Sequence, residues 1–300
     1  MLLLWGADVG STSPPFVGNI LRHNGPIDTT FTTYWHQVTP ENSGKWGKVE
    51  AVRDVMDWAQ LDDITAFAWS QGFPFKQHTF IWGLQFPDWI TDLSEAEQLA
   101  EVMEWIAGYC TRYPNTDLID VVNEPLHWPP PFKEAIGGNG VTGWDWVIWA
   151  FQTAREACPH AELLLNEKEL LKNDGTTASF LTLVRLLQRQ NLIDGIGVQG
   201  HFLESAELAT IERNLDRLAI TGLPIYISEL DVDFVDDNAQ RDRFAELFPI
   251  LWEHPSVRGI TLWGYKEGEI WRSNAYLLRR DGSQRPALIW LMDYLANQPG

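Results

Sequence analysis

Short apolar runs alternate with helical patterns along the chain, and this alternation constrains the fold more than any other feature. Nearly continuous apolar runs are typical of strands buried on both faces of a parallel sheet. Eight strands that alternate with helices predict an α/β fold, a single (β/α)8 barrel domain over residues 1–300. We expect strands at Leu2–Ala7, Thr30–Tyr34, Phe75–Phe80, Leu118–Val122, Glu162–Leu165, Gly195–Gln199, Pro224–Ser228 and Gly259–Trp263.

Between the later runs, apolar residues recur at three- and four-residue steps, as on the inward face of a helix. The pattern predicts helices at Glu95–Arg112, Trp144–Cys158, Thr176–Arg189, Glu207–Ala219, Asn238–Glu253 and Ala287–Ala296. Asp236 and Asp237 are expected to cap the helix from Asn238, because the acidic stretch from Asp231 lacks the Gly and the terminal Glu of a calcium loop. We therefore expect no metal ion and no other cofactor.

Two glutamates lie where packing does not explain them. Glu124 follows the run Leu118–Val122, and Glu229 lies in Tyr226-Ile-Ser-Glu-Leu-Asp231. In a (β/α)8 barrel the carboxyl ends of the strands form the catalytic face. Retaining glycosidases need two carboxyl groups about 5–5.5 Å apart, one to protonate the leaving oxygen and one to attack the sugar carbon. Glu124 and Glu229 are thus candidates for this pair.

Other predicted strands end in polar or aromatic residues that suit sugar recognition. They are Glu41-Asn-Ser-Gly-Lys-Trp46, His78 with Trp82 and Gln85, Asn123, Gln199-Gly-His201, and Trp263 with Trp271. Taken singly, each has a structural explanation, since a histidine is often a hydrogen-bonded structural imidazole and a tryptophan often belongs to the core. Sixteen Trp exceed what such a core requires, and aromatic faces can pack against pyranose rings.

From about Leu4 to Leu291 the chain resembles glycoside hydrolase family 10, the retaining endo-β-1,4-xylanases. The resemblance is carried by Glu41-Asn-x-x-Lys-Trp46, His78-x-x-x-Trp82-x-x-Gln85, Asp120-Val-Val-Asn-Glu124, Asp194-Gly-Ile-Gly-x-Gln-x-His201, Glu229-Leu-Asp231, Trp263-Gly and Trp271-Arg. A related barrel family would share the two glutamates but not Glu-Asn-x-x-Lys-Trp or Gln-x-His.

The resemblance implies a role for each matching residue. Glu124 would be the acid/base and Glu229 the nucleophile; His201 would lie beside the nucleophile and Asp231 would orient that imidazole. Asn123 would bind the sugar 2-hydroxyl. Glu41, Asn42, Lys45, His78, Trp82, Gln85, Gln199, Trp263 and Trp271 match residues that bind the non-reducing side of the cut.

The chain departs from this family after the fifth predicted strand. Where the family usually reads Asn-Asp-Tyr-Asn, this chain reads Asn166-Glu-Lys-Glu169, so Lys168 replaces an aromatic residue on the leaving side. The change could weaken binding there or favour a substituted or acidic xylan. Trp128, in the long loop after Glu124, could restore an aromatic platform or form a rigid roof that touches no sugar.

The net charge of −19 argues against nucleic acid and anionic membranes as partners. The expected partner is xylan or a xylo-oligosaccharide, bound by a monomer. Cys110 and Cys158 have no zinc-type spacing, and two buried free thiols are favoured over a bridge. The start Met1-Leu-Leu-Leu-Trp resembles no export signal, which leaves a secreted mature domain or, alternatively, a cytoplasmic enzyme.

The sequence leaves two alternative functions open. The same machinery could act on another β-linked glycoside, or on short or decorated xylo-oligosaccharides, because Lys168 alters the leaving side. The barrel could also bind carbohydrate without cutting it, although both glutamates and their supporting residues are present.

Overall fold

The computed structural model describes residues 15–22 and 25–298. The strands are β1 (Phe16–Leu21), β2 (Val38–Pro40), β3 (Lys76–Ile81), β4 (Leu118–Asn123), β5 (Glu162–Glu167), β6 (Gly195–Val198), β7 (Ile225–Leu230) and β8 (Val257–Leu262). The helices are α1 (Phe31–Tyr34), α2 (Trp46–Val49), α3 (Ala59–Ser70), α4 (Glu95–Arg112), α5 (Asp145–Ala157), α6 (Asp174–Gln188), α7 (Leu208–Ala219), α8 (Asp237–Trp252) and α9 (Pro286–Ala296), with 3-10 helices η1 (Asp88–Asp92) and η2 (Lys133–Ile136).

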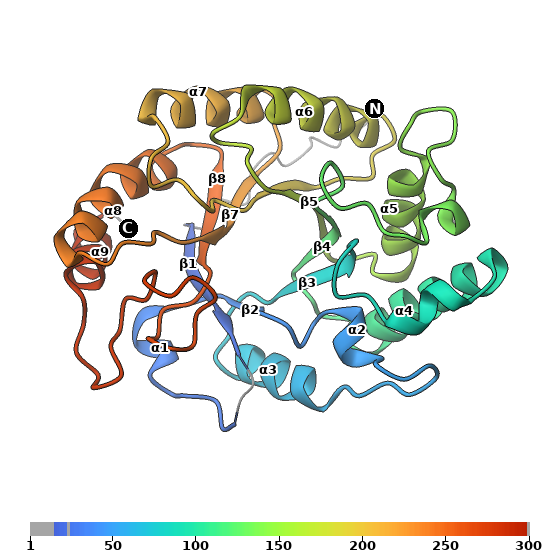
Figure 1. The fold of residues 1–300 in the computed structure, drawn as a ribbon, viewed down its shortest axis with the longest axis horizontal. Coiled ribbons are helices and arrows are strands. Elements are labelled where there is room, and N and C mark those ends of the chain that lie inside the picture. The colour runs from blue at the N-terminus through green and yellow to red at the C-terminus, as the bar shows by residue number, and fades with distance from the viewer. Residues whose placement is uncertain (1–14, 23–24, 299–300) are drawn as a thin grey trace, which may run out of the picture.

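The strands form one parallel sheet that curls into a barrel, with the helices around it (Figure 1). Their order is β2-β1-β8-β7-β6-β5-β4-β3. The two ends of this order meet at a parallel bridge between Val38 and Phe75, beside which the Val38 N–H donates to the Pro74 carbonyl at 3.0 Å. The predicted (β/α)8 architecture is confirmed.

The barrel interior changes character along its axis. Near the strand starts, Leu118, Leu164 and Tyr226 form a small apolar cluster against Phe16. Towards the strand ends the buried side chains are polar or charged, among them Asn123, Asn166 and Glu229. Buried charges persist only where partners satisfy them, so this end of the barrel is the place to look for chemistry.

The sequence predicted the second half of the barrel better than the first. The last six predicted strands correspond to β3–β8, and the predicted helices correspond to α4–α9. The strand predicted at Thr30–Tyr34 is wrong, because this β-branched and aromatic segment forms the single turn α1. The strand predicted at Leu2–Ala7 lies outside the described residues.

Strand β1 escaped prediction because its composition is unusual for a strand. A Cβ on Gly18 would lie 2.0 Å from Oε1 of Gln37, so the Gln37 side chain fills the space that glycine leaves. Asn19 is fully buried and accepts a hydrogen bond from the Gly264 N–H at 3.0 Å. Polar side chains such as these occupy the barrel interior. As a result, β1 lacks the apolar pattern by which a strand is recognised in a sequence.

The two cysteines form a disulfide, so the prediction of free thiols was wrong. Cys110 ends α4 and Cys158 follows α5, and their Cα atoms lie 5.3 Å apart. Along the chain, α4 precedes β4 and α5 follows it. In space the two helices pack side by side, which brings together residues 48 positions apart. Sequence spacing alone carries no sign of this contact.

The expected helix cap is confirmed at one of its two residues. The Asp236 carboxylate accepts hydrogen bonds from the backbone N–H groups of Asn238 and Ala239 at 3.0 and 2.8 Å. The Asp237 carboxylate instead pairs with Arg279 and Arg285.

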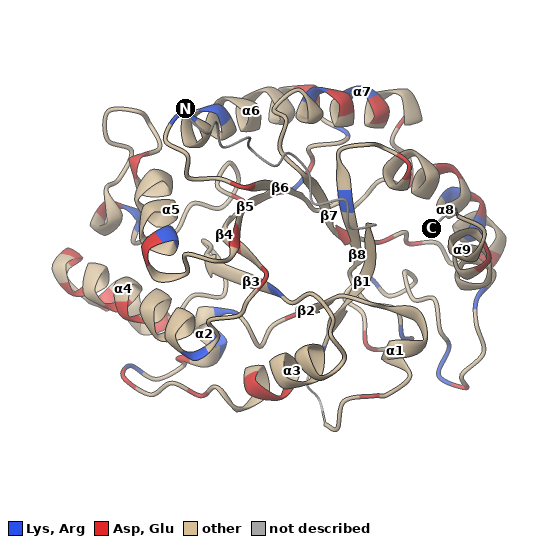
Figure 2. Cartoon of the chain, turned by 180° about the vertical axis from the view of Figure 1, so that it is seen from behind, with Lys and Arg blue, Asp and Glu red and all other residues tan. Residues whose placement is uncertain are grey.

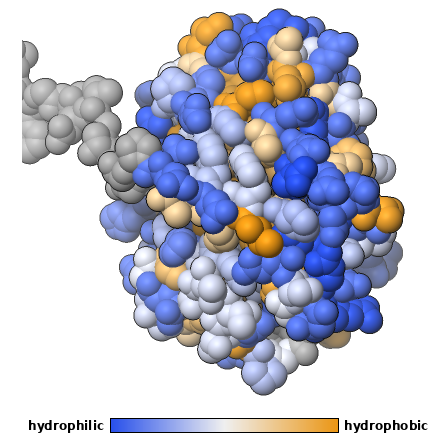
Figure 3. Space-filling view, turned by 90° about the vertical axis from the view of Figure 1, so that its left-hand side faces the viewer, coloured by the Kyte–Doolittle hydropathy of each residue, from blue (hydrophilic) through white to orange (hydrophobic). Residues whose placement is uncertain are grey.

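Acidic residues are spread over the outer helices, including α4 and α7 (Figure 2). On the face shown in Figure 3, hydrophilic residues predominate and hydrophobic ones form small separate groups. Within the described part of the chain, no helix is both long and apolar enough to cross a bilayer.

Candidate active site

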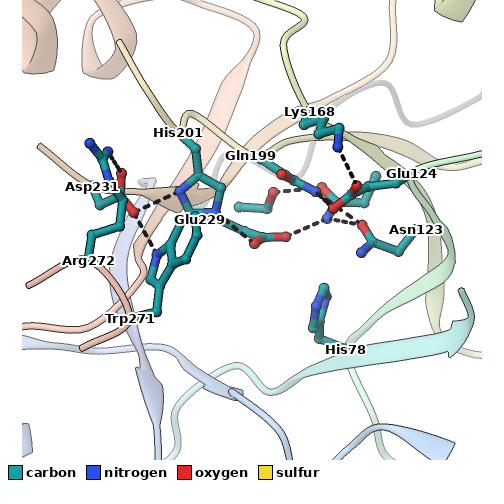
Figure 4. A network of polar contacts seen from close by, with 12 residues as sticks. His78, Asn123, Glu124, Lys168, Gln199, His201, Glu229, Asp231, Trp271 and Arg272 are labelled. Carbon is teal, nitrogen blue, oxygen red and sulfur yellow. Dashed lines mark hydrogen bonds and ion pairs between the residues drawn. The ribbon is translucent and has the colours of Figure 1, made fainter. Parts of the chain in front are cut away.

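Glu229, at the end of β7, is a buried carboxylate whose two oxygens both have close partners. Asn166 Nδ2 donates to Oε1 at 2.8 Å, and His201 Nε2 lies 3.1 Å from Oε2 (Figure 4). Burial raises the pKa of this carboxyl, but the His201 contact and the charges of His78, His201 and Lys76 outweigh it and lower the pKa to about 2. Glu229 is therefore an anion at neutral pH.

His201 is held between two carboxylates. Its Nδ1 lies 2.8 Å from Oδ2 of Asp231, on the side of the ring away from Glu229. Burial lowers the pKa of this imidazole, yet Asp231 and Glu229 together raise it to about 9. The Asp231 carboxylate also accepts from Trp271 Nε1 at 2.8 Å and from Arg272 Nη1 at 2.6 Å. A charged imidazolium thus faces Glu229 at neutral pH.

Glu124 follows β4 and has fewer partners. Gln199 Nε2 donates to its Oε1 at 2.9 Å, and Lys168 Nζ lies 3.2 Å from its Oε2. The residue takes a positive φ of 52°, which is uncommon outside glycine and is found at functional sites.

Two side-chain amides connect the surroundings of the two glutamates. Asn166 Nδ2, which donates to Glu229, also donates to Asn123 Oδ1 at 2.9 Å. Gln199 Nε2, which donates to Glu124, lies 3.4 Å from the same Asn123 oxygen. Ser228 Oγ donates to Asn166 Oδ1 at 2.6 Å and so fixes the orientation of that amide. Both carboxylates therefore belong to one hydrogen-bonded network, whose residues lie at or directly after the ends of β4, β5, β6 and β7.

Glu124 and Glu229 line one cleft of about 440 Å³ at the carboxyl ends of the strands. Of the residues to which the sequence analysis gave a role at the site, all except Asn166 and Asp231 line it too. They are Glu41, Asn42, Lys45, His78, Trp82, Gln85, Asn123, Trp128, Lys168, Gln199, His201, Trp263 and Trp271. Asn166 and Asp231 lie behind the lining, where they hold Glu229 and His201.

The wall contributed by the loops after β2 and β3 is polar and tightly connected. Lys45 Nζ and Gln85 Nε2 both donate to Asn42 Oδ1, at 3.3 and 3.1 Å. The Lys45 ammonium lies over the Trp82 ring at 5.0 Å. Burial lowers the pKa of Lys45 to about 8 despite the opposing charges of Glu229, Glu41 and Glu124. Such a wall offers both hydroxyl-binding groups and an aromatic face to a sugar.

Glu41 and His78 are each fixed by a partner of opposite charge, which is partly exposed Arg22 for Glu41 and buried Asp120 for His78. The Glu41 carboxylate accepts from Arg22 Nη2 at 2.6 Å, at the end of β1. His78 Nδ1 lies 2.8 Å from Oδ2 of Asp120, which Lys76 Nζ also approaches at 3.0 Å. The His78 ring packs edge-on against Trp263 at 5.1 Å. These contacts orient the side chains before any ligand arrives.

The opposite wall is more open and carries Lys168 and Trp128. The Lys168 ammonium lies over the Trp128 ring at 5.3 Å, and the Trp128 side chain is 45% exposed. The predicted role of Lys168 did not include a contact with Glu124, which only the folded chain shows. Trp128 offers an aromatic surface, one face of which the ammonium covers.

Three cleft residues were not among the predicted site residues: Leu84, Glu169 and Phe202. Phe202 is 48% exposed, takes a positive φ of 57°, and has the Arg272 guanidinium 4.4 Å from its ring centre. Its position directly after His201, beyond the end of a predicted strand, was the available signal. The signal for Glu169 was its place in the Asn166-Glu-Lys-Glu169 segment after the fifth predicted strand. Leu84 carried none, because a single leucine is usual in a surface loop.

The arrangement fits acid–base and nucleophilic chemistry. Among the described residues, the acidic group close enough together to bind a cation is Glu50, Asp54 and Glu101. None of these three lines the cleft. The cleft itself presents one firmly ionised carboxylate and a second carboxylate with a cation and an amide as neighbours.

The sequence of residues 13–294 matches the model of "Glycosyl hydrolase family 10". Endo-1,4-beta-xylanase B of Cellvibrio japonicus is 41% identical over 286 residues, which is 94% of this chain and 46% of the relative. An endo-1,4-beta-xylanase of Agaricus bisporus is 30% identical over 67% of this chain and 61% of its own length. This chain thus spans about half the length of the first relative and under two thirds of the second.

Solved structures share the fold at lower identity. A GH10 structure from Paenibacillus barcinonensis superposes with a TM-score of 0.84 at 23% identity, over 95% of this chain and 96% of that one. Xylanase 10B from Thermotoga petrophila RKU-1, solved in complex with xylobiose, gives a TM-score of 0.81 at 23% identity, over 94% of each chain.

Proposed function

Because this chain belongs to glycosyl hydrolase family 10, we propose that it is an endo-1,4-β-xylanase that cleaves internal bonds of xylan with retention of configuration. The observation that carries the proposal is the pair Glu124 and Glu229, which face one cleft from two different strands and share one hydrogen-bonded network. The xylanase names of the relatives support xylan as the substrate.

In the first step, a carboxylate oxygen of Glu229 attacks the anomeric carbon of the bound xylose. The bond to the leaving oxygen breaks, and Glu124 donates its proton to that oxygen. The product is a covalent glycosyl-enzyme ester on Glu229 and a shortened xylan chain. His201, charged because of Asp231, keeps Glu229 ionised for this attack.

In the second step, Glu124 is a carboxylate and takes a proton from a water molecule. The resulting hydroxide attacks the same anomeric carbon and releases Glu229 as a carboxylate. Asn123, held by Asn166 and Gln199, would bind the sugar 2-hydroxyl in both steps. Lys45, Asn42, Gln85 and Glu41 would bind hydroxyls on the non-reducing side of the cut, with Trp82 as an aromatic face.

Digestion of linear β-1,4-xylan tests this function, with the products resolved by chain length and by NMR of the new reducing end. Internal cleavage with retention yields short oligosaccharides whose first-formed reducing ends are β anomers. Release of xylose alone from chain ends would contradict the endo assignment, and α anomers formed first would contradict retention. Binding without hydrolysis would support the silent carbohydrate-binding barrel instead.

A second candidate keeps the same chemistry but a different substrate range, namely short or decorated xylo-oligosaccharides or another β-linked glycoside. The observation that favours it is Lys168, a cation on the leaving-side wall. Parallel digests of unsubstituted, arabinose-decorated and glucuronate-decorated xylan separate the two candidates by the relative kcat/KM.

We further propose that the enzyme works as a secreted monomer. The disulfide supports an oxidising location, because such bonds persist mainly outside the cytosol. Both catalytic candidates and the side chains that hold them come from one chain, so a second copy is not needed to complete the site. Light scattering of the purified protein and thiol titration before and after reduction test these two points.

A further inference from the structure

Three aromatic residues that line the cleft have about half of their surface exposed: Trp128, Phe202 and Trp271, at 45%, 48% and 48%. Trp271 matches a family residue of the non-reducing side, so Trp128 and Phe202 are the rings available to a leaving sugar. The Phe202 ring has two cations near it, the Arg272 guanidinium at 4.4 Å and the Lys172 ammonium at 5.1 Å. Among the described residues one cation lies over the Trp128 ring, so Trp128 offers the freer aromatic face.

The Trp128 ring lies beside the proposed acid/base. The Lys168 ammonium is 3.2 Å from Oε2 of Glu124 and 5.3 Å from the centre of the Trp128 ring, so a single cation contacts both. The acid/base protonates the oxygen that departs with the leaving chain, and the first sugar of that chain must therefore lie next to Glu124. The Trp128 ring thus borders the space that this sugar would occupy.

The backbone of Trp128 is held from both sides. Its N–H donates to the Glu124 carbonyl at 2.8 Å, and its carbonyl accepts from the Gly83 N–H at 3.0 Å. A Cβ on Gly83 would lie 2.3 Å from the Trp128 oxygen and 2.6 Å from the Pro129 oxygen, so this close approach requires glycine. The loop after β4 is thus fixed against the loop after β3 at the residue that carries the ring.

A second anchor holds the residues directly before Trp128. The buried Glu167 carboxylate, at the end of β5, accepts from the Leu126 N–H at 2.9 Å and lies 2.8 Å from His127 Nδ1. The same carboxylate accepts from the Lys168 N–H at 2.8 Å. The ring is therefore presented by a loop that is already ordered, and a sugar that binds it pays little conformational entropy.

Resting on the proposed function, we propose that Trp128 is a substrate-binding residue that stacks on the first xylose of the leaving chain. The C–H surface of a pyranose ring packs favourably against an indole. The family usually has an aromatic residue for this sugar after the fifth strand, where this chain has Lys168. Here the ring comes from the loop after β4 instead. The contact forms only with substrates that place a sugar on the leaving side.

Trp128→Ala tests this role on two substrates that differ on the leaving side. Linear xylohexaose has sugars on both sides of the cut, whereas β-xylobiosyl fluoride releases a fluoride ion and places no sugar there. We expect kcat/KM to fall by about tenfold on xylohexaose, because the stacking contact is lost. On the fluoride we expect the wild-type kcat/KM, which also shows that the variant is folded.

Three further variants make the result specific. Trp128→Phe keeps an aromatic face and should retain most of the activity on xylohexaose. Trp128→Leu keeps apolar bulk without the ring and should lose as much as Trp128→Ala. Trp69→Ala removes a 37% exposed tryptophan of α3, outside the cleft, and should change neither substrate.

Several outcomes would overturn the inference. Unchanged activity of Trp128→Ala and Trp128→Leu on xylohexaose would make the residue a roof that touches no sugar. Equal losses on both substrates would show that Trp128 supports the structure of the site, and equal activity of the Leu and Phe variants would make bulk the cause. A loss in Phe202→Ala but not in Trp128→Ala would assign the stacking to Phe202.

The same measurements separate this inference from the proposed function on which it rests. A wild type that hydrolyses neither substrate would overturn both. A wild type that is active on both, with Trp128 variants that match it on xylohexaose, would overturn this inference alone.

Discussion

The surroundings of Glu229 and Glu124 differ in how many polar partners hold each carboxylate. Glu229 has a donor or cation on both oxygens, and a further layer of Asp231, Trp271 and Arg272 holds its imidazole partner. Glu124 has one amide and one partly exposed ammonium. The carboxylate proposed as the nucleophile is thus embedded in a hydrogen-bonded network, whereas the one proposed as the acid/base has fewer partners, one of them partly exposed.

The Cys110–Cys158 disulfide lies away from both carboxylates. Cys110 ends α4, which leads into the start of β4, and Cys158 follows α5, which leads into the start of β5. Glu124 and Glu229 lie instead at the carboxyl ends of β4 and β7, so polar contacts rather than the covalent link hold both of them.

The largest expected effect comes from Glu229→Ala. Loss of the nucleophile should lower kcat by about 10⁴-fold or more on xylan and on activated aryl xylosides alike. Initial-rate measurements on both substrates check this, with Glu212→Ala on the exposed face of α7 as a control of unchanged activity. If Glu229→Ala kept appreciable activity on the activated substrate, the nucleophile would lie elsewhere.

Glu124→Ala should have a smaller effect that depends on the substrate. On xylan, kcat/KM should fall by about 10³-fold, since the leaving oxygen needs a proton. On an activated aryl xyloside, kcat/KM should fall less than about tenfold, because the first step then needs no acid. A burst assay separates the two steps. Equal losses on both substrates would contradict the acid/base role.

Asp231→Asn should weaken the fixed charge around Glu229 without removing it. The pKa of His201, now about 9, should fall towards its ordinary 6.5. Because the folded-state pKa is raised, the stability it contributes is complete below pH 6.5 and is lost as pH rises through about 9. NMR titration of the His201 ring and thermal unfolding from pH 6 to pH 10 measure both quantities. An unchanged titration would exclude Asp231 as the cause.

Removal of the disulfide should affect stability rather than catalysis. The bridge closes a loop of 48 residues, and the double change Cys110→Ala and Cys158→Ala should cost about 2–4 kcal/mol in the free energy of unfolding. Urea denaturation measures this loss, while kcat on xylan at 25 °C should stay at the wild-type value. A large fall in kcat without a change in stability would mean that the link positions Glu124 directly.

The second half of the barrel was predictable from the sequence because its strands are continuous apolar runs and its helices are amphipathic. The first half was not: β1 contains Gly18 and Asn19, and β2 covers only Val38–Pro40. In both strands polar side chains fill the barrel interior, so the apolar periodicity on which such predictions depend is missing.

The sequence by itself determined which residues are candidates for the chemistry, since motifs fix residue types at strand ends and the barrel brings all strand ends to one face. Only the tertiary structure decided which side chains touch. The Lys168–Glu124 ion pair, the placing of Asn166 beneath Glu229, and the Cys110–Cys158 bridge each join segments far apart along the chain. Such contacts depend on packing angles and loop paths, which have no local signature in the sequence.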